Sequence, residues 1–397
     1  MSGEEDAAAV KTLLVCSDVT LGFSVPQVAL MARSLQQLLG CRVVIVEPDM
    51  KKRLELLDVP GCEVRRVATR MPPHHPIFRV EYVRAAREIY EELRPDYLLI
   101  LNAAVIPPLL LSSHKPECAI YYMLESSDHQ VNAGGRLYYD MNRMVASSID
   151  LVVVPERRRY EIDAARLGWN NLPVVEVLNI SAAPCPRRER PEDCRFLFAG
   201  TLNRASGFDW LCDPRLADFN IDVAGPLDSS EARELLGQFL APRGSGERRY
   251  LGLLPHADLL GRLHDYAYRI VLWKPEDVNT LFASPNKLFE SIGYMVPPVA
   301  LPNPQVLDVV RRHRCGIVAQ DFGLDAFCHA MSDAALIFPT ATYDRLTAGC
   351  EAAGRAELNW DAQFGKVARA LQALGLASAD GLRRGPDHDG RGLPADL

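Results

Sequence analysis

The first half of the chain alternates short continuous apolar runs with longer segments in which apolar residues recur every third or fourth position. Continuous apolar runs are typical of strands buried on both faces of a parallel sheet, and the longer segments are typical of amphipathic helices. The predicted strands are 13–17, 42–48, 62–68, 96–102, 119–125, 149–155 and 174–181, and the predicted helices are 26–39, 80–93, 136–147 and 157–167. This alternation predicts an α/β domain with a parallel sheet.

The second half repeats the alternation after a segment that lacks apolar periodicity. Residues 181–194 are rich in Pro and Arg, which is typical of a domain linker. The predicted strands that follow are 195–199, 221–227, 269–273, 299–301 and 315–320, and predicted helices begin near Gly207 and cover 305–313, 324–338, 340–353 and 360–374. We therefore predict two α/β domains, 1–185 and 193–355, followed by a helical segment 356–376 and a disordered tail 377–397.

Residues 283–300, with the sequence ASPNKLFESIGYMVPPVA, combine a helix start, a buried stripe and a strand. We expect Ser284 to cap the free amides of the helix and Pro285 to occupy its first position. The residues that recur at helical spacing and predict the buried stripe are Leu288, Ile292 and Met295. Two consecutive prolines then end the helix before the strand.

Another side of the same helix carries groups that suit a ligand. Asn286 and Lys287 lie in the first turn, where the helix dipole is positive, and Glu290 follows one turn later. Such a helix can hold an anion at its tip and a diol on its flank. The alternative is an ordinary amphipathic helix whose polar face is only solvated, and spacing alone does not separate the two.

Composition and charge narrow the class of protein. The chain has 397 residues, 48% hydrophobic and 24% charged, which is typical of a soluble protein large enough for two cores. A net charge of −7 without a long basic run argues against nucleic-acid binding. The N-terminal sequence lacks the plan of a signal peptide, no apolar run is long enough to span a bilayer, and the cysteines follow no zinc spacing. We expect a cytoplasmic protein, for which peripheral contact with a membrane stays open.

The segment SPNKLFE, followed by a small apolar turn, a proline and a strand, resembles the donor-binding motif of retaining GT-B glycosyltransferases of family 4. The matching residues are Pro285, Asn286, Lys287, Leu288, Glu290 and Pro297. The motif differs at Met295, where the family usually has glycine, and at Phe282, where many members carry a second glutamate. The resemblance implies an α/β fold of two Rossmann-like domains (GT-B), with the C-terminal helix returning to the N-terminal domain.

In the resembling family, the second domain binds a nucleotide sugar. The resemblance places at this donor the residues Gly200, Thr201, Arg204, Gly252, Leu253, Asn286, Lys287, Leu288 and Glu290. Thr201 and Ser206 stand where the family has an arginine and a lysine for the pyrophosphate, so Arg204 is the only cation of this loop. We expect Arg204 and Lys287 to share the phosphate groups, and Glu290 to accept both ribose hydroxyls.

The first domain offers candidate residues at the ends of its predicted strands, where open α/β sheets place ligands. Gly22 follows the first strand and is a further donor-binding candidate, with a turn glycine that has no ligand as the alternative. Glu125 matches the acid of a strand-end pair in the family, although Leu124 replaces its histidine. We expect Glu125 to act in catalysis beside Arg204 and Lys287. Asp128 and His129 are expected to contact the acceptor, with an ordinary surface histidine as the alternative for His129.

The resemblance implies a retaining glycosyltransferase that moves a sugar from a UDP- or GDP-linked donor to a glycan, lipid-linked or small-molecule acceptor. No acidic pair with DxD spacing follows a strand, so we expect activity without a metal and no cofactor besides the nucleotide-sugar co-substrate. A non-catalytic partner subunit of the same fold, a nucleotide-sugar epimerase and a nucleotide-binding regulator stay open as alternatives.

Overall fold

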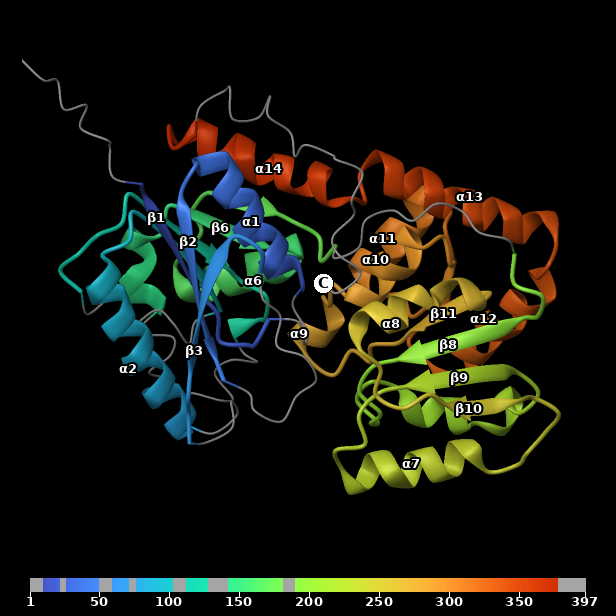
Figure 1. The fold of residues 1–397 in the computed structure, drawn as a ribbon. Coiled ribbons are helices and arrows are strands. Elements are labelled where there is room, and N and C mark those ends of the chain that lie inside the picture. Colours follow the sequence, from blue (N-terminus) through green and yellow to red (C-terminus); the bar gives the residue numbers. More distant parts are fainter. Residues whose placement is uncertain are drawn as a thin grey trace, which may run out of the picture. The chain divides into compact units, whose positions relative to one another are not determined.

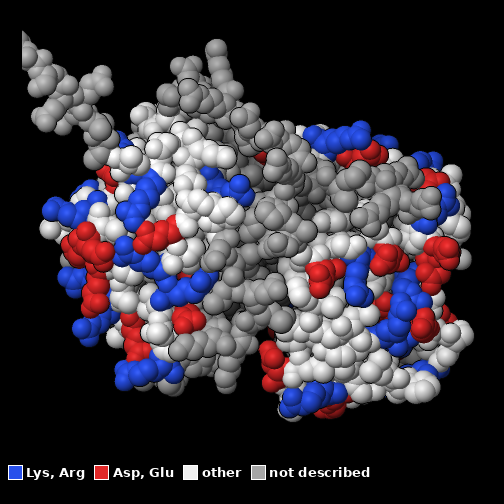
Figure 2. All heavy atoms as spheres, viewed as in Figure 1, with Lys and Arg blue, Asp and Glu red and all other residues white. Residues whose placement is uncertain are grey.

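The computed structural model describes residues 10–21, 26–49, 59–70, 76–102, 112–127, 142–180 and 190–377, and for 76–79 it describes only the backbone (Figure 1). The described chain forms two compact units. Unit 1 contains the described parts of Met1–Val177 and Phe364–Arg391, and unit 2 contains the described part of Leu178–Gln363. On the face shown in Figure 2, acidic and basic side chains are interspersed over both units.

Unit 1 is built on a parallel sheet with the strand order β3-β2-β1-β4-β5-β6-β7. Its strands are β1 (Thr12–Cys16), β2 (Arg42–Pro48), β3 (Cys62–Val67), β4 (Tyr97–Leu101), β5 (Cys118–Tyr122), β6 (Leu151–Val154) and β7 (Val174–Glu176). Its described helices are α1 (Pro26–Leu39), α2 (Pro76–Leu93), α6 (Arg157–Leu167) and the 3₁₀ turn η2 (Ala146–Ser148). Leu14 on β1 pairs with Val44 on β2 and with Leu98 on β4, and none of the three is exposed. The continuous apolar runs therefore form the buried parallel sheet that they predict.

Some boundaries in unit 1 differ from the sequence prediction. α2 begins at Pro76 rather than near residue 80, because proline is well suited to the first turn of a helix. β5 ends at Tyr122, so Glu125 lies in the loop beyond the strand and not at its end. Most of the predicted helix 136–147 lies outside the described residues.

Unit 2 is built on a second parallel sheet, with the order β10-β9-β8-β11-β12-β13. Its strands are β8 (Arg195–Ala199), β9 (Asn220–Ala224), β10 (Arg248–Tyr250), β11 (Tyr268–Val271), β12 (Pro298–Ala300) and β13 (Ile317–Val318). The chain proceeds outward from β8 to β10 and then crosses to β11 on the other side of β8. The topological switch point of unit 2 therefore lies between β8 and β11.

Helices cover both faces of the second sheet. The α-helices are α7 (Ser230–Leu240), α8 (His256–Gly261), α9 (Val278–Leu281), α10 (Asn286–Gly293), α11 (Pro304–His313), α12 (Leu324–Ile337) and α13 (Ala341–Ala356), and the 3₁₀ turns are η3 (Phe208–Cys212), η4 (Pro214–Leu216) and η5 (Leu263–Asp265). Figure 1 shows α7 on one side of β8–β10 and α8 on the other. Phe198 packs in the same cluster as Phe239 of α7, whereas Leu197 packs with Leu260 of α8. Alternate side chains of β8 thus pack into two hydrophobic clusters on opposite faces of the sheet.

The segment after β8 does not form the α-helix that the sequence predicts near Gly207. Gly207 has a φ of +79° and is followed by the short 3₁₀ turn η3. Its N–H donates to the Arg204 carbonyl, so the chain closes a tight turn before it can extend as a helix.

The last described helix, α14 (Trp360–Ala373), crosses from one unit to the other. Residues from Phe364 onward belong to unit 1, where Lys366 Nζ donates to the carbonyl of Glu176 at 3.2 Å. The C-terminal helix therefore joins the N-terminal domain, which confirms the expected fold class.

Candidate functional site

Three neighbouring strands of unit 2 are each followed by a glycine with positive φ: Gly200 after β8 (+149°), Gly225 after β9 (+157°) and Gly252 beyond β10 (+82°). The Gly225 N–H donates to the Gly252 carbonyl at 3.0 Å, and the Gly200 N–H donates to the Ala224 carbonyl at 2.9 Å. A Cβ atom added to Gly225 would lie 2.0 Å from the Gly200 carbonyl oxygen, so a larger residue would have to move the backbone. These turns pack tightly at the carboxyl edge of the sheet, where open α/β sheets bind ligands.

Lys287 brings a positive charge to this edge. A Cβ added to Gly200 would lie 2.6 Å from Lys287 Nζ, so the absence of a side chain at Gly200 makes room for the ammonium group. The Lys287 side chain is only partly exposed, and it forms no hydrogen bond or ion pair within the described chain. Burial, and next the positive charge of Arg269, lower its pKa to about 8, against the opposing effect of Glu290. Among the described residues, Lys287 is therefore a cation without an anion in ion-pair contact.

Aromatic rings place Lys287 at the switch point. Its Nζ lies 4.9 Å from the ring centroid of Phe198 on β8 and 5.7 Å from that of Trp273, two residues beyond β11. Both distances are within the range of cation–π attraction, which offsets part of the cost of burying the charge. Strands β8 and β11 flank the switch point, so Lys287 lies between their carboxyl ends.

The start of α10 differs from its predicted form. The N-cap residue is Pro285, and its side chain makes no capping hydrogen bond, so Asn286 and not Pro285 occupies the first helical position. Ser284 does not cap the helix, and its buried Oγ has no hydrogen-bond partner within the described chain. The buried Nε1 of Trp273 likewise has no partner there. The Trp273 ring lies close to Lys287 Nζ and Ser284 precedes Lys287 by three residues, so two further buried polar groups of this region lack a partner among the described residues, which is unusual for buried polar groups.

Glu290, one turn further along α10, is buried rather than on a solvated face. Only 4% of the residue is exposed. Its Oε2 forms an ion pair with Arg269 Nη1 at 2.8 Å, and its Oε1 lies 2.9 Å from His256 Nε2. Burial raises the pKa of the carboxyl, but the charge of Arg269 and the hydrogen bond with His256 outweigh it and lower the pKa to about 2. The interpretation of α10 as a helix with a merely solvated polar face is therefore wrong.

Arg204, the only cation of the predicted phosphate loop after β8, does not lie beside Lys287 but pairs elsewhere. Arg204 is exposed and forms an ion pair with Glu231 at 3.4 Å. Ser206 is buried, and its Oγ donates to the Thr201 carbonyl at 2.6 Å, which closes the turn. Thr201 itself is exposed. Of the two cations expected to share the phosphate, the structure holds only Lys287 in the glycine turn.

Other predicted donor residues take different positions. Leu288 is fully buried in the core between α10 and its neighbours, so its side chain has a packing role. Asn286 is half-buried at the first position of α10, one residue before Lys287. Leu253 is 46% exposed beside Gly252, which places the segment after β10 at the surface of unit 2.

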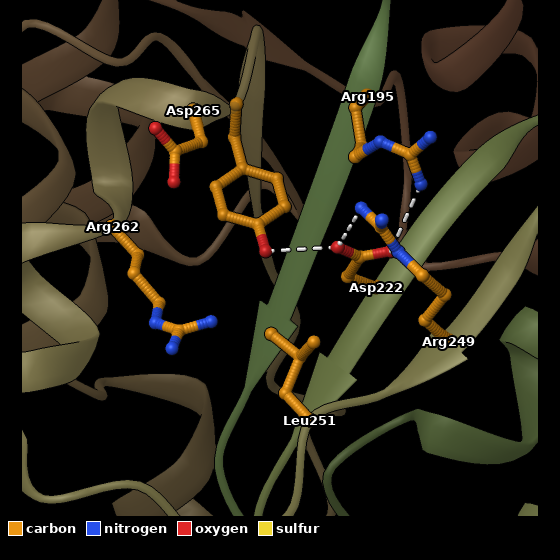
Figure 3. Close-up of a pocket in the computed structure, with 7 residues that line it drawn as sticks. Arg195, Asp222, Arg249, Leu251, Arg262 and Asp265 are labelled. Atoms are coloured by element: carbon orange, nitrogen blue, oxygen red, sulfur yellow. Dashed lines mark hydrogen bonds and ion pairs between the residues drawn. The ribbon is translucent and has the colours of Figure 1, made fainter.

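A separate cluster of charges lies on the α8 side of the same sheet, around a cavity of about 270 Å³ (Figure 3). Its lining residues are Arg195, Asp222, Arg249, Leu251, Arg262, Asp265 and Tyr266. Asp222 is fully buried at its centre and lies two residues before the end of β9, so the cluster is set back from the glycine turns.

In unit 1, the residue that organises the strand ends is Asn102, directly after β4. Its Nδ2 donates to Asp18 at 3.2 Å, and its Oδ1 accepts the N–H groups of Leu124 and Glu125 at 3.1 Å. Asn102 has a φ of +49°, a conformation that asparagine tolerates better than most residues. Arg159 of α6 is buried and donates to the Leu124 carbonyl. The backbone around Glu125 is thus fixed from two sides, while Gly22, Asp128 and His129 lie outside the described residues.

Comparison with known proteins gives a result at the level of structure. No protein-family model and no curated protein sequence matches the chain. Sucrose-phosphate synthase from Thermosynechococcus elongatus superposes with a TM-score of 0.67 at 13% identity, over 92% of this chain and 100% of that one. WaaG, a glycosyltransferase of lipopolysaccharide biosynthesis, gives 0.66 at 10% identity, over 91% and 100%. Anabaena Alr3699/HepE, solved with UDP-glucose, gives 0.66 at 12% identity, over 92% and 99%. The chain has the GT-B fold.

In this GT-B chain, the groups beyond β8 and β11 that lack a hydrogen-bond partner among the described residues suit an anion. Lys287 is cationic, and the Trp273 indole and Ser284 hydroxyl are hydrogen-bond donors. Within the ranges that the structure describes, no group of three His, Cys, Asp or Glu side chains could hold a metal ion. Among the described helices, none is both long and apolar enough to cross a lipid bilayer.

The sequence prediction did not include His256, Arg269, Trp273 or Gly225. Arg269 carried a usable signal, because it is a charged residue inside the otherwise apolar run 268–273. A cation on a buried strand requires a buried anion, and Glu290 is the nearest carboxylate in the following helix. His256 follows a Gly- and Pro-containing segment, but nothing in its local sequence indicates a contact with α10.

Proposed function

We propose that this GT-B chain is a glycosyltransferase whose unit 2 binds a nucleotide-activated sugar through its phosphate groups. One observation carries the proposal: Lys287 is a partly buried cation that forms no ion pair among the described residues, and it lies in the first turn of a helix at the switch point of a parallel sheet. Burying an unpaired charge costs free energy, and a bound anion would remove that cost. The N-terminal amides and dipole of α10 favour the same sign of ligand charge.

The proposed reaction requires charge stabilisation at this position. As the bond between the sugar and the nucleoside diphosphate breaks, negative charge grows on the phosphate oxygens. Lys287 and the first turn of α10 would stabilise that charge without a metal ion. We propose a UDP- or GDP-linked donor and retention of configuration, for which the motif resemblance of residues 284–290 is the support.

Glu290 is proposed to bind the ribose of the donor. Its carboxylate is ionised at neutral pH, and it lies one turn from Lys287 on the same helix. A charged carboxylate is a strong acceptor for sugar hydroxyls. Glu125 of unit 1, held by Asn102, is proposed to act on the sugar or acceptor side, with Asp128 and His129 as further acceptor contacts.

Calorimetric titration tests the binding step. The protein is titrated with UDP, GDP, the two corresponding nucleosides, and the UDP- and GDP-linked sugars. We expect one diphosphate to bind at least tenfold more tightly than its nucleoside, because Lys287 contacts the phosphate. If every diphosphate binds as weakly as its nucleoside, or none binds, the proposal is wrong.

Consumption of the bound nucleotide sugar, with and without candidate acceptors, tests the chemical step. Release of nucleoside diphosphate together with a product of unchanged anomeric configuration is the expected result.

A non-catalytic nucleotide-binding subunit is a second candidate. Arg204 is exposed and paired with Glu231, and Ser206 is used to close a turn, so the loop after β8 offers less to a phosphate than the family motif does. Tight binding of a nucleotide sugar without its consumption under any acceptor would favour this candidate.

A further inference from the structure

The Glu290 carboxylate has two contacts from two different elements. His256 is the first residue of α8 and contacts Oε1 at 2.9 Å, and Arg269 of β11 contacts Oε2 at 2.8 Å. These are the contacts that the described chain makes to the carboxylate oxygens. An ionised carboxylate has about four acceptor positions, so each oxygen of Glu290 retains one. Two hydroxyl groups on adjacent carbons could occupy the two remaining positions.

The partner of His256 determines which of its ring nitrogens carries the donated proton. Glu290 is paired with a buried guanidinium and is therefore an anion that can only accept. His256 must then carry its proton on Nε2 and donate it to Oε1.

Arg269 and His256 have different access to a ligand. Arg269 lies on a central strand and is only 1% exposed, so it balances the charge of Glu290 from the sheet and is not accessible to a ligand. The His256 side chain is 28% exposed, and it directly follows the segment with Gly252 and Leu253. The hydrogen bond of His256 therefore connects the surface segment after β10 with the buried carboxylate of Glu290 on α10.

We propose that His256 is a positioning residue that orients the Glu290 carboxylate, together with Arg269, so that its open acceptor positions receive the vicinal diol of a ribose; this rests on the proposed function. In this role His256 acts through Glu290, and what the role requires is the hydrogen bond that His256 Nε2–H donates to Glu290 Oε1. A residue that presents an N–H at the same place, such as glutamine, should substitute for it.

The test compares ligands with and without the diol. UDP or GDP, whichever the protein binds, is titrated alongside its 2′,3′-dideoxy analogue into the wild-type protein and into His256→Ala and His256→Gln. We expect His256→Ala to weaken the diphosphate by about tenfold, His256→Gln to recover affinity to within about threefold, and the dideoxy analogue to bind all three proteins alike. His313→Ala is the matched control, because His313 forms a comparable pair with Glu357 at 2.7 Å elsewhere in unit 2.

Other outcomes separate this inference from the proposed function. Equal losses for both ligands in His256→Ala, or no loss at all, would overturn the role of His256 while leaving nucleotide binding intact. A protein that binds no diphosphate would overturn the proposed function. A ¹⁵N NMR spectrum of the wild-type imidazoles, with His256 assigned by its loss in His256→Gln, gives a second test without a ligand. A proton on Nδ1 rather than Nε2 would contradict the inference.

Discussion

In the described part of unit 2, two carboxylates are buried on the same side of the sheet, and they differ in how many of their acceptor positions are occupied. Asp222 accepts from Arg195 Nη1 at 3.0 Å, from Arg249 Nε and Nη2 at 3.0 and 2.8 Å, and from the Tyr266 hydroxyl at 2.9 Å (Figure 3). These four donors fill the acceptor capacity of a carboxylate. Glu290 has two contacts and retains capacity for two more.

The difference separates a structural cluster from a ligand site. The saturated carboxylate of Asp222 joins β8, β9, β10 and the chain after η5, and no acceptor position on it remains for a ligand. Glu290 is charged, buried and only half satisfied, and a buried polar group in that state suggests a binding role. Its neighbour Lys287 also has no hydrogen-bond or ion-pair partner among the described residues. The exposed Arg262 lines the cavity at Asp222 (Figure 3).

The largest effect is expected from Glu290→Gln. The substitution leaves the guanidinium of Arg269 buried without a counter-charge, which costs about 3–5 kcal/mol. Urea unfolding should therefore show a large loss of stability, and the double variant Arg269→Met/Glu290→Gln should lose less because no charge is left unpaired. A loss below about 1 kcal/mol in the single variant would contradict the pairing of Glu290 with Arg269.

Asp222→Asn should cost less and should leave ligand binding unchanged. Arg195 keeps Glu247 at 2.5 Å and Arg249 is half-exposed, so water and other acids replace part of what Asp222 provides. We expect a loss of about 1–3 kcal/mol in unfolding free energy, typical of a removed charged hydrogen bond. The affinity for nucleoside diphosphate should equal that of the wild type. A tenfold loss of affinity would show that Asp222 also contributes to ligand binding, and would contradict the assignment of a purely structural role to it.

Lys287→Met should weaken nucleoside diphosphate by about tenfold, or about 1.4 kcal/mol, with little effect on the nucleoside. Its stability should not fall, because the lowered pKa of Lys287 means that the folded state disfavours the protonated form below pH 8. Arg262→Gln removes an exposed guanidinium beside the Asp222 cavity and is the matched control. Equal affinity of all three proteins for diphosphate, measured by calorimetry, would exclude Lys287 as the phosphate contact.

The pH dependence of affinity should carry the signature of Lys287. The free protein loses this proton as pH rises through about 8, whereas a bound phosphate stabilises the protonated form and raises the pKa. Affinity for diphosphate should therefore fall by about tenfold between pH 7 and pH 9. The nucleoside should show no such fall, and neither should Lys287→Met with diphosphate. A pH-independent affinity in the wild type would remove the support that the lowered pKa gives.

The sequence by itself determined the α/β architecture and most of its elements. The predicted bounds of α1, β2, α6 and β8 agree with the structure, because apolar period and proline or glycine stops act locally. The sequence also identified the helix that carries Lys287 and Glu290 and the turn that contains Gly200. Each of those predictions depends on residues that are close together in the sequence, within one helix or at one strand end.

Only the tertiary structure decided which groups meet and how well each is satisfied. Lys287 reaches the Gly200 turn because β8 and β11 are neighbours, and this pairing joins segments far apart in the chain. Arg269 and His256 meet Glu290 because β11 and the start of α8 both pack against α10, and the same packing removes the carboxylate from solvent. Burial and hydrogen-bond saturation are properties of assembled layers, and a local sequence pattern contains neither.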